Sequence, residues 1–253
     1  MSHSDLKRIL IQYDIHIADA EDLKVLQNYE IVLICDDSGS MCVGSLPGET
    51  KWSTTGPSRW SELKDAVGCI VELAVCFDKN GIDIFFLNSP AIKGVTSVKD
   101  PRFTAFFAGQ PRGITPLTET LCTVAKEVGG SKPVLLIIFT DGEPDDGSAK
   151  FISAVGDLVE RRSTPHTFRV QIMACTGDDE AVGWLNDLDG RFTEVDCVDD
   201  YQSERDQILK AGRVNQFTKG DWIMKAMLGP VLQKFGDLDE KKGILSCFAW
   251  CCK

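Results

Sequence analysis

Three oxygen-bearing side chains stand at alternate positions in the segment Asp36-Asp37-Ser38-Gly39-Ser40. The acid and two hydroxyls, Asp36, Ser38 and Ser40, directly follow an apolar run, where the chain must turn toward solvent, and Gly39 allows a tight turn. Carboxylate and hydroxyl oxygens are the ligands that a small, hard cation such as Mg²⁺ accepts. The segment therefore predicts a divalent-cation site, although Asp and Ser are also common in turns and caps.

This pattern, Asp-x-Ser-x-Ser, resembles the start of the metal-ion-dependent adhesion site of the von Willebrand factor A family. In that family a Thr from a later loop and an Asp after the central strand complete the site. The segments Gly113-Ile114-Thr115-Pro116-Leu117 and Phe139-Thr140-Asp141-Gly142 look like those two elements. The order of the three segments, after two apolar strands and before a helix, argues against chance agreement. The resemblance covers residues 29–200.

The resemblance implies a role for each of five residues. Ser38 and Ser40 would coordinate the metal directly, Thr115 directly or through water, and Asp36 and Asp141 largely through water. Neutral hydroxyl ligands leave the cation under-neutralised, so it gains by taking a carboxylate oxygen from a partner. We therefore expect a non-catalytic module that binds Asp, Glu or a C-terminal carboxylate of a partner protein through Mg²⁺, with Mn²⁺ as the alternative metal.

The sequence departs from the family pattern at two places. Ile114 stands where many members have a second glycine, which could restrict the Thr loop, and the stretch from Cys42 to Arg59 is longer than a minimal connection. Neither departure removes a ligand. Asp37 is an additional acid, and we expect its side chain to point away from the site because neighbours alternate along an extended chain.

Enzymatic readings of the same residues fit less well. An aspartyl-phosphate phosphatase needs a second acid two residues after the nucleophile, and Ser38 stands there. The chain has no Gly-x-Ser-x-Gly elbow and no Gly-x-x-x-x-Gly-Lys loop, and its three histidines lie in no recognisable catalytic context. Two alternatives stay open: metal-activated hydrolysis, and a scaffold that needs no metal.

Apolar strand-like runs alternate with helical spacing along the chain. Strands are expected at 30–36, 82–87, 93–98, 133–140, 168–174 and 192–195, and helices at 60–74, 116–128, 151–159 and 179–188. The alternation predicts a Rossmann-like, doubly wound and mostly parallel α/β sheet. We expect a helical extension over 1–28, the domain that carries the cation site over 29–200, and a second helical extension over 201–253. In that second extension a capping box at 203–206 would open one helix.

Composition limits the remaining possibilities. A net charge of −11 without a basic cluster argues against a nucleic-acid partner. No apolar run approaches the roughly 18 residues that cross a bilayer, and the first ten residues lack the apolar core of a secretory signal. Several of the ten cysteines, such as Cys35, Cys69 and Cys76, lie in apolar segments and are typical of core residues. A reducing, cytoplasmic location is expected.

The C-terminal segment Cys247-Phe248-Ala249-Trp250-Cys251-Cys252-Lys253 combines three cysteines with two aromatic residues. Acylation of these thiols would give a membrane tether. The simpler interpretation is that the aromatic residues pack on the domain. A zinc site is disfavoured because a fourth ligand is missing nearby.

Overall fold

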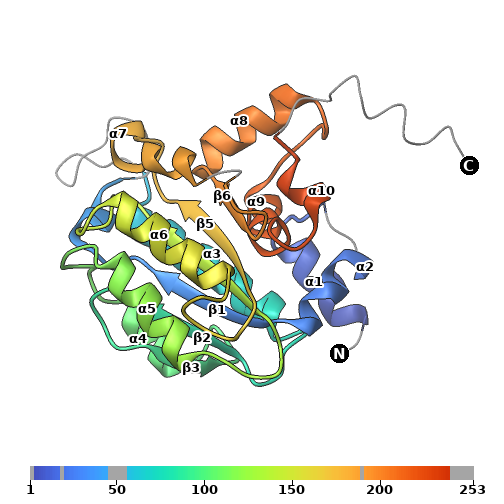
Figure 1. Cartoon of the computed structure of the whole chain (residues 1–253). Helices are drawn as coiled ribbons and strands as arrows, with labels where there is room; N and C mark the ends of the chain where they lie inside the picture. Colours follow the sequence, from blue (N-terminus) through green and yellow to red (C-terminus); the bar gives the residue numbers. More distant parts are fainter. Residues whose placement is uncertain (1–2, 18–19, 45–55, 189–190, 240–253) are drawn as a thin grey trace, which may run out of the picture.

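The computed structural model describes residues 3–17, 20–44, 56–188 and 191–239, and within them a six-stranded sheet (Figure 1). The strands are β1 (Glu30–Cys35), β2 (Ile82–Phe86), β3 (Ile92–Val95), β4 (Val134–Thr140), β5 (Phe168–Ala174) and β6 (Val195–Val198). All neighbouring strands are parallel except β2 and β3, which are antiparallel. The fold is therefore α/β with a mostly parallel, Rossmann-like sheet, as the sequence predicted.

Across the sheet, the strands lie in the order β3-β2-β1-β4-β5-β6. The chain builds outward from β1 through β2 to β3, then returns to the middle with β4 and builds in the other direction. β1 and β4 are neighbours, and Cys35 lies beside Phe139 in their register. In open α/β sheets, ligands bind outside the carboxyl ends of the strands where the winding direction reverses. Here that position lies between the ends of β1 and β4.

Helices and short 3-10 turns connect and follow the strands. They are α1 (His3–Gln12), α2 (Ala20–Leu23), η1 (Lys24–Asn28), η2 (Gly39–Cys42), α3 (Arg59–Ala74), α4 (Pro101–Phe107), α5 (Leu117–Glu127), α6 (Ser148–Val159), α7 (Asp179–Val182), η3 (Gly183–Asp187), α8 (Tyr201–Ala211), α9 (Lys219–Leu228) and α10 (Gln233–Gly236). Ser58 caps α3 by accepting the backbone N–H of Ser61.

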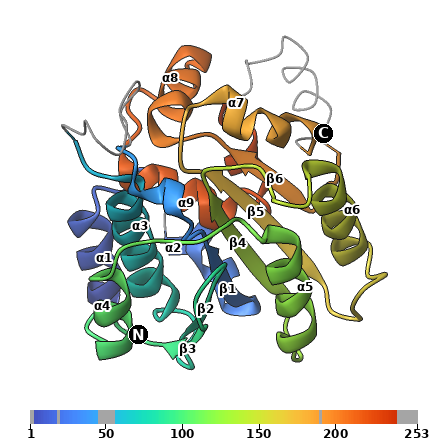
Figure 2. The ribbon, with the colours of Figure 1, turned by 90° about the vertical axis from the view of Figure 1, so that its left-hand side faces the viewer.

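Helices cover both faces of the sheet, which explains the continuous apolar runs of its central strands. Successive residues along a strand face opposite sides. Leu33 and Ile137 pack with α3 and α9 in one hydrophobic cluster, whereas Ile34 and Ile138 pack with α5 and α6 in a second. Figure 2 shows α5 and α6 on one side of the sheet and α3 and α9 on the other. Every residue of β4 is buried.

Three elements differ from the sequence predictions. The short helix α4 is not predicted, although Asp100 followed by Pro101 is a cap signal, and Asp100 does accept the N–H of Arg102. The cap of α8 is Asp200, upstream of the predicted capping box; the capping box of the C-terminal region instead opens α9, at Thr218 and Asp221. Finally, β6 begins at Val195, where the predicted strand ends, because its pairing with β5 starts there.

The helices at the two ends of the described chain pack onto the same core as the sheet. Leu6 and Ile9 of α1 and Met224 of α9 belong to the cluster that contains Leu33 of β1. The proposed division at residues 28 and 200 stays a prediction. Among the described residues, no helix is long and apolar enough to cross a membrane. The cysteine-rich segment 247–253 lies outside the described residues.

Candidate metal centre

The two acids of the predicted site follow the two central strands. Asp36 comes directly after β1, and Asp141 directly after β4. The ladder between these strands continues one residue further, since the N–H of Asp36 donates to the carbonyl of Phe139 at 3.0 Å. The parallel pairing therefore brings Asp36 and Asp141 to the same edge of the sheet, at the reversal point of the winding.

Hydrogen bonds join the Asp-x-Ser-x-Ser segment to Asp141. The backbone N–H of Ser38 donates to Asp36 Oδ1 at 2.8 Å, which tightens the turn after the strand. The Ser38 and Ser40 hydroxyl oxygens lie 2.9 Å apart, and the Ser40 hydroxyl donates to Asp141 Oδ1 at 2.7 Å. Four of the five predicted ligand residues thus form one connected group.

Thr115, the fifth residue, lies in a loop that touches this group through its backbone. Gly113 accepts the N–H of Gly39 at 3.2 Å, which places the loop against the serine segment. The backbone of Thr115 is held by Asp145, whose Oδ2 accepts the Thr115 N–H at 2.7 Å. Thr115 is half-buried, and within the described residues its hydroxyl makes no hydrogen bond to the other four side chains.

Asp37 points away from the group, as predicted, and supports the Thr loop. Its Oδ1 accepts the backbone N–H of Asn88 at 2.7 Å, and its Oδ2 accepts the Ser89 hydroxyl at 2.6 Å. Asn88 in turn clamps Ile114 on both sides: Asn88 Oδ1 accepts the Ile114 N–H at 3.1 Å, and its Nδ2 donates to the Ile114 carbonyl at 2.8 Å. The side chain of Ile114 remains 64% exposed.

Two buried carboxylates interact electrostatically at this site. Asp36 is 0% exposed and Asp141 is 2% exposed. Burial, followed by the negative charge of Asp141, raises the pKa of Asp36 to about 6, against the lowering effect of hydrogen bonds from Ser38 and Thr140. The Thr140 hydroxyl donates to Asp36 Oδ2 at 2.9 Å. A positive charge at this place would stabilise both acids.

Arg59 supplies one such charge and was not predicted from the sequence. Its Nη1 lies 2.8 Å from Asp141 Oδ2, and the side chain is only 13% exposed. Arg59 is the first residue of α3, where a cation is unfavourable because the N-terminal end of a helix is itself positive. The sequence signal for Arg59 is limited to this unfavourable position, and it does not identify the acid that compensates for it.

The donor chemistry fits a hard divalent cation. The group offers carboxylate and hydroxyl oxygens. Because the Ser40 hydroxyl donates to Asp141, Ser38 is the donor in the Ser38–Ser40 hydrogen bond, and one lone pair of the Ser40 oxygen remains to face a cation. Within the described residues no cluster of three or more His, Cys, Asp or Glu side chains is placed to hold a metal. Any cation here would rely on hydroxyls in addition to the two acids.

Comparisons with known proteins assign the chain to no family. No family model matches the chain, and no curated protein matches it. Among solved structures, the chain is similar to the pilus adhesin SpaC from Lactobacillus rhamnosus GG, with 12% sequence identity and a TM-score of 0.48. The match covers 79% of this chain and 31% of the adhesin, so the chain corresponds to about a third of that protein's length.

Proposed function

We propose that this chain contains a von Willebrand factor type A domain that holds one divalent cation, Mg²⁺ or Mn²⁺, and uses it to bind a carboxylate of a partner protein. The observation that carries the proposal is the convergence of Asp36, Ser38, Ser40 and Asp141 at the reversal point between β1 and β4. These residues come from segments about a hundred positions apart, and they meet where α/β sheets bind ligands.

The exposure of the ligand residues suits a cation that is open on one side. Asp36, Ser38 and Asp141 are buried and would hold the cation on the side that faces the protein interior. Ser40 is exposed and Thr115 is half-buried. When bound, the cation supplies a Lewis-acidic position that a carboxylate oxygen can fill. The role of this chain would be to orient that position and leave it accessible.

The cysteines favour a reducing compartment, and we place the module in the cytoplasm. In the described part of the chain, Cys35, Cys42, Cys69, Cys122 and Cys175 are free thiols. Cys35 is fully buried at the end of β1, and burial raises the pKa of its thiol well above the usual range, so it behaves as a core residue.

Cation uptake tests the first half of the proposal. Titration of the purified protein with Mn²⁺, followed by electron paramagnetic resonance, should show one site, and Asp141→Ala should weaken binding by about tenfold or more. The matched control is Asp146→Asn, an exposed acid of the same loop that is paired with Lys150. If wild type takes up no Mn²⁺ or Mg²⁺, or if both variants bind as wild type does, the assignment of the site is wrong.

Carboxylate recognition tests the second half. Immobilised peptides that end in Asp should retain the protein in Mg²⁺ and release it when a chelator is added, whereas the matching Asn amide peptides should not retain it. Asp36→Ala should abolish the retention. Equal retention with and without chelator would favour a metal-independent scaffold. Turnover of a phosphate ester under the same conditions would favour a hydrolase.

A further inference from the structure

The ion pair between Arg59 and Asp141 occupies the carboxylate that the proposed cation site needs. Asp141 Oδ1 accepts the hydroxyl of Ser40 at 2.7 Å, and Asp141 Oδ2 accepts Arg59 Nη1 at 2.8 Å. Both oxygens of this carboxylate, which is 0% exposed at the side chain, are therefore engaged by the chain itself. A cation, or a water bound to it, would have to share Asp141 with these two donors.

The positive charges of Arg59 and of a bound cation oppose each other at Asp141. The guanidinium offsets part of the repulsion between Asp36 and Asp141 when no metal is bound, which is the task that a divalent cation would perform. A guanidinium and a divalent cation held on one buried carboxylate repel each other strongly, because little solvent separates them. Of the two contacts to Asp141, the one to Arg59 is therefore the contact that cation binding opposes.

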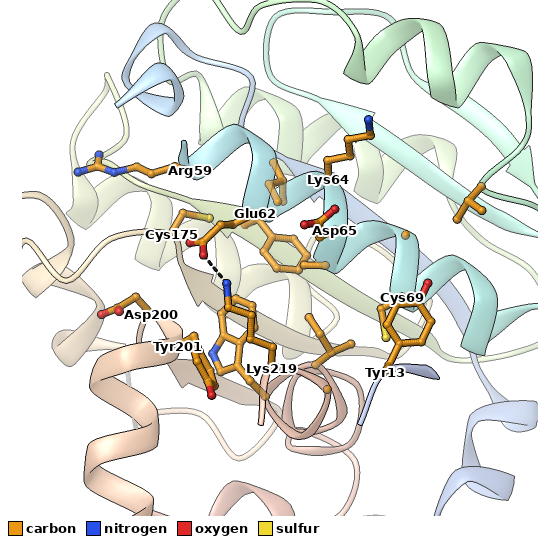
Figure 3. A pocket seen from close by; sticks show the side chains of 18 of the residues that line it. Tyr13, Arg59, Glu62, Lys64, Asp65, Cys69, Cys175, Asp200, Tyr201 and Lys219 are labelled. Carbon is orange, nitrogen blue, oxygen red and sulfur yellow. Dashed lines mark hydrogen bonds and ion pairs between the residues drawn. The ribbon is translucent and has the colours of Figure 1, made fainter. Parts of the chain in front are cut away.

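Arg59 also has a place to which its guanidinium can move. It lines a cavity of about 680 Å³ between α3 and the beginnings of α8 and α9 (Figure 3). Asp200 lines the same cavity, and within the described part of the chain its Oδ2 is buried without a hydrogen-bond partner. Arg59 Nε likewise finds no partner there, so the present pairing leaves one of its donors unused.

We propose that Arg59 is a built-in competitor of the divalent cation: it pairs with Asp141 in the metal-free protein and is displaced toward the cavity beside Asp200 when the cation binds. This inference rests on the proposed function, and it concerns regulation of the same site. The consequence is a site whose cation affinity is set by an internal ion pair as well as by its ligands.

Substitution of Arg59 measures the competition directly. Arg59→Gln should bind Mn²⁺ tenfold or more tightly than wild type, because the cation no longer displaces a charge-assisted hydrogen bond. Arg59→Lys keeps the positive charge and should stay within about threefold of wild type. Arg112→Gln is the matched control: Arg112 is an exposed arginine beside the Thr loop, and its loss should also change affinity less than about threefold because solvent and salt screen its charge.

The outcomes separate this inference from the proposed function. If Arg59→Gln binds Mn²⁺ with wild-type affinity, the proposed competition between Arg59 and the cation is wrong, but the proposed cation site is kept. If neither wild type nor Arg59→Gln takes up Mn²⁺, both ideas are wrong. If only Arg59→Gln takes it up, Arg59 blocks the site in wild type, and the proposed function of the wild-type chain is wrong.

A second measurement needs no variant, in case Arg59→Gln does not fold. In the NMR spectrum of wild type, saturating Mg²⁺ should shift the side-chain Nε–H signal of Arg59 and accelerate its exchange with water, whereas the signal of Arg112 should not change. An Arg59 signal that is unaffected while Mg²⁺ is bound would overturn the displacement.

Discussion

Replacement of the buried Lys225 by Met is the sharpest test of how the C-terminal helices are held to the core. Lys225 of α9 is 1% exposed at the side chain, and its Nζ lies 2.6 Å from Glu204 of α8, which is 2% exposed, and 2.9 Å from Asp239. Methionine keeps the length and most of the volume of the lysine stem but removes the charge. The variant therefore leaves a buried carboxylate without its cation.

The magnitude follows from the burial of both partners. Removal of one member of a buried ion pair costs about 3–5 kcal/mol, because the remaining charge is uncompensated. Burial raises the pKa of Glu204 to about 7, even though the charge and hydrogen bond of Lys225 lower it. At pH 8 Glu204 is therefore charged in wild type, and the full cost of Lys225→Met should appear in the free energy of unfolding.

The pH dependence has a definite sign. A carboxyl whose folded pKa is raised holds a proton that the unfolded chain releases, so its contribution to stability falls as pH rises from the unfolded to the folded pKa. In wild type this window ends near pH 7. Without Lys225 the pKa of Glu204 rises further and the window extends upward. The cost of Lys225→Met should be about 1.4 kcal/mol larger at pH 8 than at pH 6.

Urea unfolding followed by tryptophan fluorescence and circular dichroism, at pH 6 and pH 8, measures these differences. The control is Lys219→Met on the same helix, whose ion pair with Glu62 lies at the surface, with side chains 58% and 33% exposed. It should cost less than about 1 kcal/mol at either pH. If the two variants lose equal stability, or if the cost of Lys225→Met is independent of pH, the buried pair does not behave as reasoned.

Three further outcomes are expected. Gly81 has φ +83°, and a Cβ there would lie 2.7 Å from a carbonyl of β3. Gly81→Ala should therefore lower the free energy of unfolding, measured in urea, by about 1–3 kcal/mol. An unchanged midpoint of the urea transition would contradict this strain. Gly113→Ala, at φ +110°, would bring its Cβ into a clash with Asn88 Oδ1. It should cost more free energy of Mn²⁺ binding than free energy of unfolding, and the reverse order would show that the clamp on the Thr loop does not position the candidate site. Thiol labelling of the native protein can be followed by mass spectrometry. Exposed Cys122 should react within minutes, whereas buried Cys35 should react only in denaturant. Rapid labelling of Cys35 would show that the end of β1 opens.

The sheet, and the meeting of Asp36 and Asp141 at one edge of it, could be predicted from the sequence because both depend on local patterns. The run Glu30–Cys35 is apolar and is followed by Asp36, and Val134–Thr140 is apolar and is followed by Asp141. Strands buried on both faces imply helices on both sides and parallel pairing. Parallel pairing in turn places the residues that follow the strands at one edge.

The contacts that link distant segments could not be predicted in the same way. Arg59 meets Asp141 across more than eighty positions of sequence, and nothing in the composition around either residue encodes that meeting. The Asn88 clamp is similar: an Asn after β2 is an ordinary loop residue until the fold brings Ile114 beside it. Such contacts are decided by packing, which a linear pattern does not contain.

Helix caps could be predicted from the sequence only in part. Ser203, followed three residues later by Asp206, satisfies the acidic capping pattern as well as Thr218 and Asp221 do, yet only the second pair opens a helix. The helix at the first place begins earlier because Asp200 accepts the N–H groups of Gln202 and Ser203. Competing caps a few residues apart are resolved by where the preceding strand, β6, ends.

The strand order has a consequence for when the candidate site is assembled during synthesis. β1 through β3 form one half of the sheet and β4 through β6 the other, and the register of β1 with β4 joins positions such as Glu30 and Val134. A nascent chain that has emerged only as far as β3 carries both serines but lacks the second acid. If the proposed site is right, cation capture would begin only after β4 has paired with β1 and brought Asp141 to the serines.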